Sequence, residues 1–102
     1  MYQYRITLEG LGALEGSTAV FETENHDDLF VVLGRMAGRL GLSEEETKSF
    51  GVGLKLFGEP ILKHKDNALL QTMKPAFLEF MKTMKEQIIA QEKAAQEAEA
   101  AK

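Results

Sequence analysis

The sequence lacks cysteine and tryptophan, contains only two prolines, and has no long apolar run. Without cysteine there is no disulfide scaffold, no thiolate nucleophile and no Cys-ligated zinc or iron–sulfur site. A membrane-spanning helix needs about 20 consecutive, predominantly apolar residues, and no such stretch exists. The first residues also lack a basic segment followed by an apolar one, so we expect no signal peptide. These absences predict a cytoplasmic protein without a membrane segment.

Charge argues against a nucleic-acid partner. The net charge is −4, and residues 1–51 carry four basic and nine acidic side chains, a balance of −5. Residues 52–85 carry six basic and three acidic side chains, a balance of +3, but all six basic residues are lysines. Affinity for a phosphate backbone depends on basic neutralisation, and bidentate contacts to bases or phosphates require arginine.

Two-residue alternation dominates the first part of the chain. Apolar or hydroxyl residues occupy every second position: Tyr2, Tyr4, Ile6 and Leu8, then Ala19, Phe21 and Thr23. Because side chains alternate across a strand, the pattern predicts antiparallel strands over residues 2–9 and 17–24, joined by a broad glycine-rich loop over 10–16. An isolated pair of strands is marginal in water, so we expect helices to cover its apolar face, with Leu11 and Leu14 folded over the sheet.

Helical spacing replaces alternation from residue 25 onward. Apolar residues recur three or four positions apart: Leu29, Val32, Met36 and Leu40; Phe50, Leu54, Phe57 and Ile61; Phe77, Met81, Met84 and Ile88. We expect the first helix to begin at an Asn25 cap, to carry Asp27 and Asp28 in its first turn, and to run to about Leu40, with Gly41 as the residue that ends it.

Three further signals place the later helices. Ser43-Glu44-Glu45-Glu46 is a capping box that starts the second helix. Proline in a helix interior removes a hydrogen bond, which predicts a kink or break around Gly58–Pro60. Residues 68–73 read as a short helical turn, and Pro75 suits the first position of the last helix.

These elements define an α+β fold, an antiparallel two-stranded hairpin packed on three helices in the order ββααα. Residues 2–88 are expected to form a single compact domain. Residues 89–102 are rich in Ala, Glu and Lys and have little to bury, so they are expected to form a polar helical or frayed tail that extends the last helix.

Two clusters invite a functional interpretation. His26, Asp27 and Asp28 offer metal-ligand and acid–base chemistry, but neighbours on a helix point about 100° apart, and a charged helix start explains the two carboxylates equally well. Glycines in the Gly51–Gly58 segment suggest either a close helix contact or a ligand against the backbone. The segment lacks the preceding strand and the Lys-Ser/Thr pair of a phosphate-binding loop.

Several segments resemble a family of small bacterial proteins, domain-of-unknown-function family 3861. They are Tyr4-Arg5-Ile6-Thr7-Leu8-Glu9, Glu24-Asn25-His26-Asp27-Asp28, Gly53-Leu54-Lys55-Leu56-Phe57 with Glu59, and Pro75-Ala76-Phe77 with Glu79-Phe80-Met81-Lys82. The resemblance covers about residues 2–85, and the tail departs from it. It implies a bacterial, cytoplasmic protein, but it assigns no activity, cofactor or functional residue.

Two hypotheses of different classes follow. The first is a non-catalytic protein-interaction module, possibly homodimeric, because the sheet has open edges and the surplus of Phe and Met suits a partner surface. The alternative is a small-ligand or enzymatic site near the Gly51–Glu59 helix and His26, although an i, i+4 ion pair explains Lys55 and Glu59 as well. The candidate polar surface is the set Asn25, His26, Asp27, Asp28, Lys55 and Glu59. No catalytic residue, metal ligand or cofactor is assigned.

Overall fold

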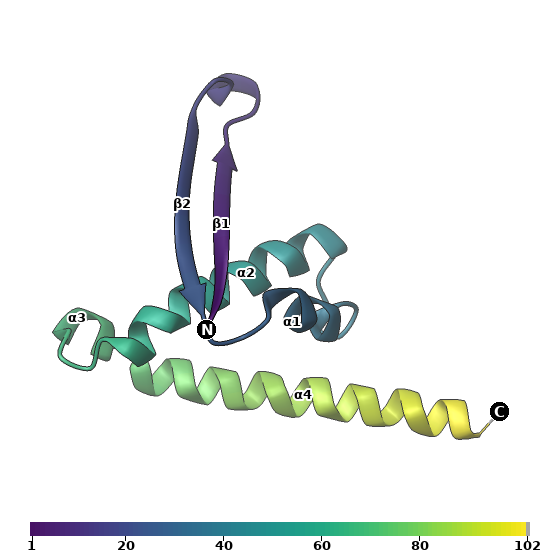
Figure 1. Cartoon of the computed structure of the whole chain (residues 1–102). Coiled ribbons are helices and arrows are strands. Elements are labelled where there is room, and N and C mark those ends of the chain that lie inside the picture. The colour runs from purple at the N-terminus through teal and green to yellow at the C-terminus, as the bar shows by residue number, and fades with distance from the viewer. Residues whose placement is uncertain (102) are drawn as a thin grey trace.

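The computed structural model describes residues 1–101 and consists of a β-hairpin followed by helices (Figure 1). Its elements are β1 (Tyr2–Glu9), a short 3₁₀ helix (η1, Gly12–Leu14), β2 (Thr18–Asn25), α1 (Leu29–Met36), α2 (Glu44–Lys63), α3 (Ala68–Gln71) and α4 (Lys74–Ala100). The α+β class and the ββ-then-helices order are therefore confirmed. The short helix α3 is the turn expected at residues 68–73 and adds a fourth helix to the three of the predicted order.

The two strands pair antiparallel along their whole length. Ile6 lies opposite Phe21 and Leu8 lies opposite Ala19, so one face of the hairpin carries the apolar residues. The other face carries polar residues, including Arg5 opposite Glu22. The alternation read from the sequence thus fixes which side chains share a face.

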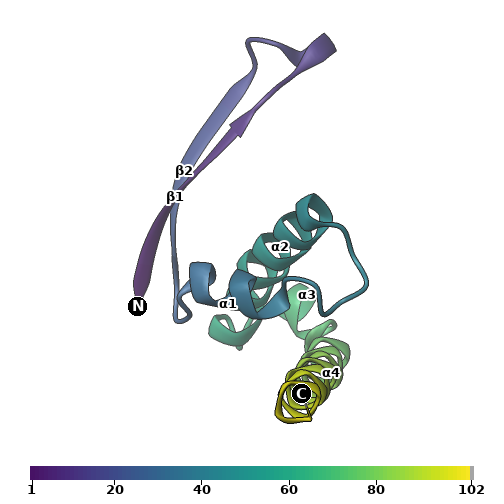
Figure 2. The ribbon, with the colours of Figure 1, turned by 90° about the vertical axis from the view of Figure 1, so that its right-hand side faces the viewer.

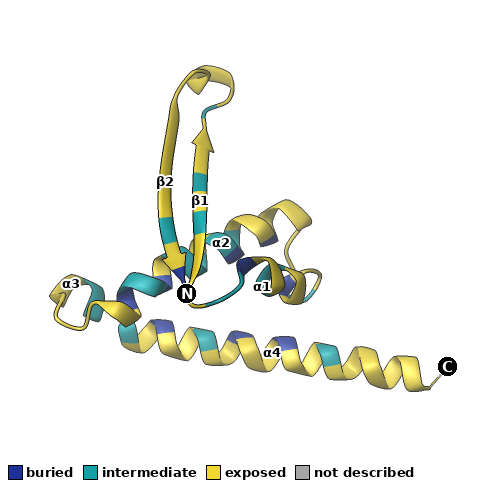
Figure 3. Cartoon of the chain, viewed as in Figure 1, coloured by how far each residue is buried: buried dark blue, intermediate teal, exposed yellow. Residues whose placement is uncertain are grey.

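Helices do not cover the apolar face of the hairpin, contrary to the sequence-based expectation. Only the open end of the hairpin meets the helices, and the rest projects away from them (Figure 2). Leu11 and Leu14, expected to fold over the sheet, are 78% and 65% exposed. The Cα radius of gyration is 16.6 Å, compared with about 13 Å for a compact domain of 100 residues. Burial colouring shows the same contrast, with an exposed hairpin above a partly buried helical layer (Figure 3).

The start and the end of α1 both differ from the prediction. Asp28 caps the helix, and its carboxylate accepts hydrogen bonds from the backbone N–H groups of Phe30 and Val31. Asn25 is instead the last residue of β2, and Asp27 precedes the cap. The helix ends at Met36 rather than near Leu40, because Ala37 leaves the helical region with a ψ of 122° and Gly38 follows with a positive φ of 74°.

Helix α2 begins as predicted and continues further than predicted. The capping box is present: Ser43 accepts from the Glu46 N–H while the Glu46 carboxylate accepts from the Ser43 N–H. Of the kink or break predicted around Gly58–Pro60, the break is wrong, since the helix runs to Lys63 and the His64 N–H still donates to the Pro60 carbonyl at 2.9 Å. Proline costs the helix one backbone hydrogen bond, and burial of the adjacent Ile61, which is fully enclosed, offsets that loss.

The hydrophobic core lies between α1, α2 and α4. One cluster of buried side chains there consists of Met36, Met84 and Ile88, packed against partly buried Val32 and Leu54. The predicted stripe of α4 is correct, and the buried positions of this helix face α2 (Figure 3). Two edge-on ring contacts, Phe50–Phe80 and Phe57–Phe77, also join α2 to α4.

The last helix continues through the Ala/Glu/Lys segment to Ala100. Its second half touches the end of α1. Gln87 and Gln91 both donate to the Arg39 carbonyl, at 2.9 and 3.0 Å, and Glu92 accepts from Arg35 at 2.9 Å. Within residues 1–101, no helix combines the length and apolarity needed to cross a membrane.

Close helix contacts explain two of the glycines in α2. A Cβ added at Gly51 would lie 2.6 Å from Leu33 Cδ2 of α1, and one at Gly58 would lie 2.3 Å from Phe77 Cζ of α4. Gly53 has no neighbouring atom within 4 Å of such a Cβ. The ordinary interpretation of these glycines, close approach of another helix, is thus correct at Gly51 and Gly58.

The glycines allow a matched stability test. Gly53→Ala should stabilise the protein by about 0.5–1 kcal/mol, because alanine favours the helix and meets no neighbour. Gly58→Ala should destabilise it by about 1–3 kcal/mol, because the new methyl group displaces the buried Phe77 ring. Urea unfolding of the two variants provides the measurement. Equal stabilisation by both substitutions would show that α4 does not pack closely on Gly58.

Candidate functional site

The junction between the hairpin and the helices is held by a buried side chain, Asn25. It is 1% exposed and ends β2. Its Nδ2 donates to the Lys55 carbonyl of α2 at 3.0 Å, and its Oδ1 accepts from the Asp27 N–H at 3.0 Å. Because an unpaired buried amide is costly, these two bonds define where β2 meets α2 and how the chain turns toward α1.

Tyr4 ties the first strand to the same turn. Its hydroxyl donates to the Asp27 carbonyl and accepts from the Leu29 N–H, both at 2.8 Å. The hydroxyl therefore satisfies an orphan N–H at the start of α1, which a helix cannot satisfy internally. The Tyr4 ring also lies 6.2 Å from the Phe30 ring, centroid to centroid. Both strands are thus anchored at the point where α1 begins.

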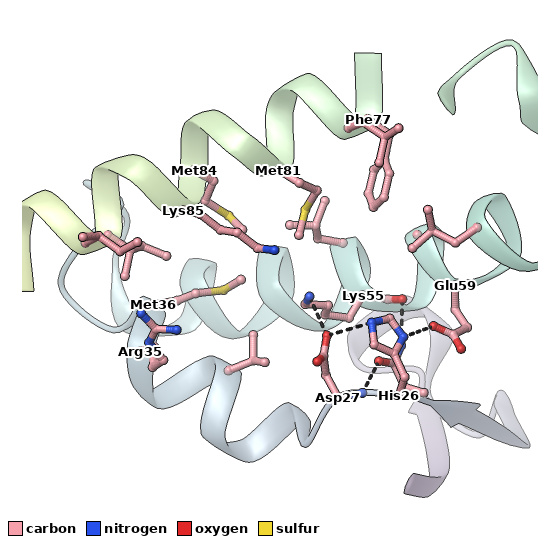
Figure 4. Close-up of a pocket in the computed structure, with 18 residues that line it drawn as sticks. His26, Asp27, Arg35, Met36, Lys55, Glu59, Phe77, Met81, Met84 and Lys85 are labelled. Carbon is pink, nitrogen blue, oxygen red and sulfur yellow. Dashed lines mark hydrogen bonds and ion pairs between the residues drawn. The ribbon is translucent and has the colours of Figure 1, made fainter. Parts of the chain in front are cut away.

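A row of four charged or titratable side chains lies beside this junction. His26 Nδ1 lies 2.8 Å from Glu59 Oε2, and His26 Nε2 lies 3.5 Å from Asp27 Oδ2. Lys55 Nζ then donates to the same Asp27 oxygen at 2.8 Å. Lys55 and Glu59 are largely buried, with 13% and 15% of their side chains exposed. Figure 4 shows the row crossing from α2 to the loop before α1.

The ammonium group of Lys55 controls the charge state of Asp27. Its hydrogen bond is the main reason that the pKa of Asp27 lies below its ordinary value, and the charges of Lys55, His26 and Lys85 act in the same direction. Partial burial opposes the effect without cancelling it. Asp27 therefore stays ionised to a lower pH than a free aspartate.

Next to the row of charges, a pocket of about 420 Å³ opens between α1, α2 and α4 (Figure 4). Its walls are mainly apolar and come from all three helices: Val32, Met36, Leu54, Leu62, Phe77, Leu78, Met81, Met84, Ile88 and Ile89. Its polar lining is the junction row together with Asn25, Arg35 and Lys85. A largely apolar cavity of this size with a few polar groups at one side is typical of a small-ligand site.

Four of the six candidate residues lie together in the row, and the other two make different contacts. His26, Asp27, Lys55 and Glu59 form the row, whereas Asp28 serves as the helix cap. Asn25 lies beside the row as a buried anchor rather than on the surface. The i, i+4 ion pair suggested for Lys55 and Glu59 is not formed, because each residue pairs with the loop before α1 instead.

Sequence reasoning missed the contribution of α4 to this site. Lys85, which lies outside the predicted apolar stripe of this helix, is exposed but lines the pocket. Arg35 lines it from α1 and pairs with Glu92. The only sequence signal was position: Lys85 directly follows Met84 of the buried stripe, and Arg35 directly precedes Met36.

The row is a network of contacts between the loop before α1 and α2. A neutral imidazole carries one N–H, yet both ring nitrogens of His26 face carboxylates. In the part of the chain that the structure describes, no hydroxyl group hydrogen-bonds to His26. Over the same residues, no group of three or more His, Asp or Glu side chains is arranged to hold a metal ion.

Replacing Lys55 with glutamine tests the electrostatics of the row. In Lys55→Gln the pKa of Asp27 should rise, and the protein should lose about 1 kcal/mol of stability at pH 7, a figure that allows for solvent screening. Because the folded-state pKa of Asp27 is depressed, the stabilisation exists above the ordinary value of 3.8 and is lost as pH falls through the folded-state pKa. The stability difference should therefore shrink toward pH 3.

Carboxyl carbon NMR titration and urea unfolding at pH 7 and pH 3 measure the two effects. Lys63→Gln is the matched control, since Lys63 is exposed at the end of the same helix. An unchanged Asp27 pKa in Lys55→Gln would contradict the assigned cause.

Comparison with known proteins agrees with this architecture. A crystal structure of a protein of unknown function from Pectobacterium atrosepticum SCRI1043, at 2.20 Å resolution, has 35% identity and a TM-score of 0.75. The similarity covers 83% of this chain and 97% of that one. No curated protein matches. The model of the family described as "Domain of Unknown Function with solved-structure structure (DUF3861)" matches residues 2–86. The chain therefore belongs to the DUF3861 family.

Proposed function

We propose that the protein is a non-catalytic interaction module that forms a homodimer through the edge of β1. The observation that carries the proposal is the projecting hairpin, whose apolar face lacks a helical cover in the monomer. Leu8 is 67% exposed and Phe21 is 48% exposed, although both lie on the apolar face. A two-stranded sheet of this kind is marginal in water, and pairing with a second hairpin would give it four strands.

The hydrogen-bond pattern identifies the groups that are free to pair. The Gly10 N–H donates to the Ser17 carbonyl at 2.8 Å. Ladder bonds alternate along an antiparallel pair, so the even-numbered residues of β1 bond to β2. Thr7 and Val20 face each other in a non-hydrogen-bonded pair, and each directs its backbone N–H outward, at opposite edges.

Charge favours the β1 edge over the β2 edge. The outward-bonding residues of β2 include Glu22 and Glu24 but no basic residue, so two β2 strands placed together would form no pair of opposite charges between these residues. Along β1, Arg5 and Glu9 lie at equal distances from Thr7. A two-fold axis at Thr7 would place Arg5 opposite Glu9 of the partner subunit, and opposite charges across strands stabilise a sheet.

The same axis joins the apolar faces. With Thr7 opposite itself, Ile6 falls opposite Leu8 of the partner subunit on the apolar side of the sheet. Phe21 continues this surface within each hairpin, since it is the cross-strand neighbour of Ile6. A dimer of this kind therefore satisfies the free edge and enlarges the apolar contact in one arrangement. We place this dimer in the bacterial cytoplasm, which is consistent with the absence of cysteine.

Proline substitutions at the two edges test the arrangement. Thr7→Pro should give a monomer, because it removes the central N–H of the β1 edge without breaking a bond between β1 and β2. Val20→Pro makes the same change at the opposite edge and should leave the dimer intact. Sedimentation equilibrium measures both, and Thr7→Ala controls for loss of the side chain alone. A dimer that survives both proline changes would rule out edge pairing.

Reversal of charge tests the register. Arg5→Glu should weaken the dimer, because it would face Glu9 of the partner subunit, and the double change Arg5→Glu with Glu9→Arg should restore it. The expected weakening is about three- to tenfold in the dissociation constant, given that exposed pairs contribute up to about 1 kcal/mol. A double variant as weak as the single one would contradict the register at Thr7.

A further inference from the structure

The pocket between α1, α2 and α4 has a polar side at which all but one of the charged groups are already paired. Asp27 is bonded to Lys55, Glu59 to His26, and Arg35 to Glu92. The carboxylates of Asp27 and Glu59, which line the pocket, are therefore already paired with side chains of the same chain.

Lys85 is the exception. Among residues 1–101 it forms no hydrogen bond or ion pair, although its charge is close enough to influence Asp27. Figure 4 shows its side chain reaching from α4 toward the row of charges on the opposite wall. The pocket thus presents one free ammonium group beside an apolar chamber.

The apolar chamber suits a flexible hydrocarbon group. Three of the five methionines of the chain, Met36, Met81 and Met84, line it. Methionine has three rotatable bonds and adapts to irregular shapes, so a wall of this composition can close around ligands that differ in detail. The Phe77 ring adds a broad apolar surface at one end of the same chamber (Figure 4).

We propose that this pocket binds an amphipathic carboxylate, with the acid group at Lys85 and the hydrocarbon part against the methionine wall. The volume of about 420 Å³ lies in the range of small-molecule sites. A charge-assisted hydrogen bond from an unpaired lysine stabilises an anion. A cationic ligand would instead be repelled by Lys85 and Lys55, and the carboxylates of the lining are already paired within the chain. The lining includes no residue of β1, so the site does not depend on the proposed dimer.

Methionine methyl NMR tests the proposal with an internal control. Decanoate, used below micelle-forming concentrations, should shift the methyl signals of Met36, Met81 and Met84. The signals of Met1 and Met73, which do not line the pocket, should stay unchanged. Equal shifts at all five methionines, or no shifts at any, would overturn the proposal.

Two lysine variants separate a specific acid contact from general attraction. Lys85→Gln should weaken decanoate binding roughly tenfold, the effect of removing a charge-assisted hydrogen bond, and leave decanol binding unchanged. Lys82→Gln, one turn earlier on the exposed side of α4, should affect neither probe. Both lysines are exposed, so neither change disturbs the core. If wild type and Lys85→Gln bind decanoate equally, Lys85 does not contact the acid group and the proposal is wrong.

Two further outcomes would assign the pocket to another occupant. Tighter binding of decylammonium than of decanoate would show that the carboxylates of the row, and not Lys85, select the ligand. Shifts of the three pocket methyl signals on dilution of the protein alone, without any probe, would assign the pocket to a second copy of the chain. Either result would overturn the proposed ligand class.

Discussion

The arrangement of the whole chain depends on the buried amide of Asn25. It bonds at once to a backbone carbonyl in the middle of α2 and to the backbone of the turn before α1. The strand, the turn and the long helix therefore share one anchor, and any change in the angle of the hairpin must break a bond buried from water. Tyr4 reinforces the anchor from the other strand. This is why a hairpin that touches the helices only at its end still has a defined direction.

The same anchor borders the pocket. The Asn25 bonds hold the turn before α1 against Lys55 of α2, and the pocket lined by α1, α2 and α4 lies beside this anchor. The charged row closes the side of the chamber next to the anchor. There the largely buried side chains of Lys55 and Glu59 are each paired with a group of opposite or titratable charge, which offsets the cost of burying them. Stability and site are thus products of the same few contacts, and a variant that weakens the junction is expected to alter both.

Local patterns predicted the elements well, because each depends on interactions within a few residues. The capping box at Ser43, the strand over residues 2–9 and the buried stripe of α4 are of this kind. The error at the start of α1 arose where a distant contact decided between local alternatives. Asn25 and Asp28 are both good caps by type, and the carbonyl of Lys55, thirty residues away, determines that Asn25 is used elsewhere. Likewise, alternation shows which hairpin face is apolar but not what covers it, and helical spacing cannot show that Lys85 comes to lie opposite Asp27.

Two glutamines in the second half of α4 hold this helix in position along its own axis. Gln87 and Gln91 stand one turn apart and donate to a single carbonyl, that of Arg39. Sliding α4 along its axis by one turn, about 5.4 Å, would leave only one of these bonds and separate Glu92 from Arg35. It would also carry Lys85 out of place by the same distance. The family match ends at residue 86, so the side chains that hold α4 in this position lie beyond the matched segment.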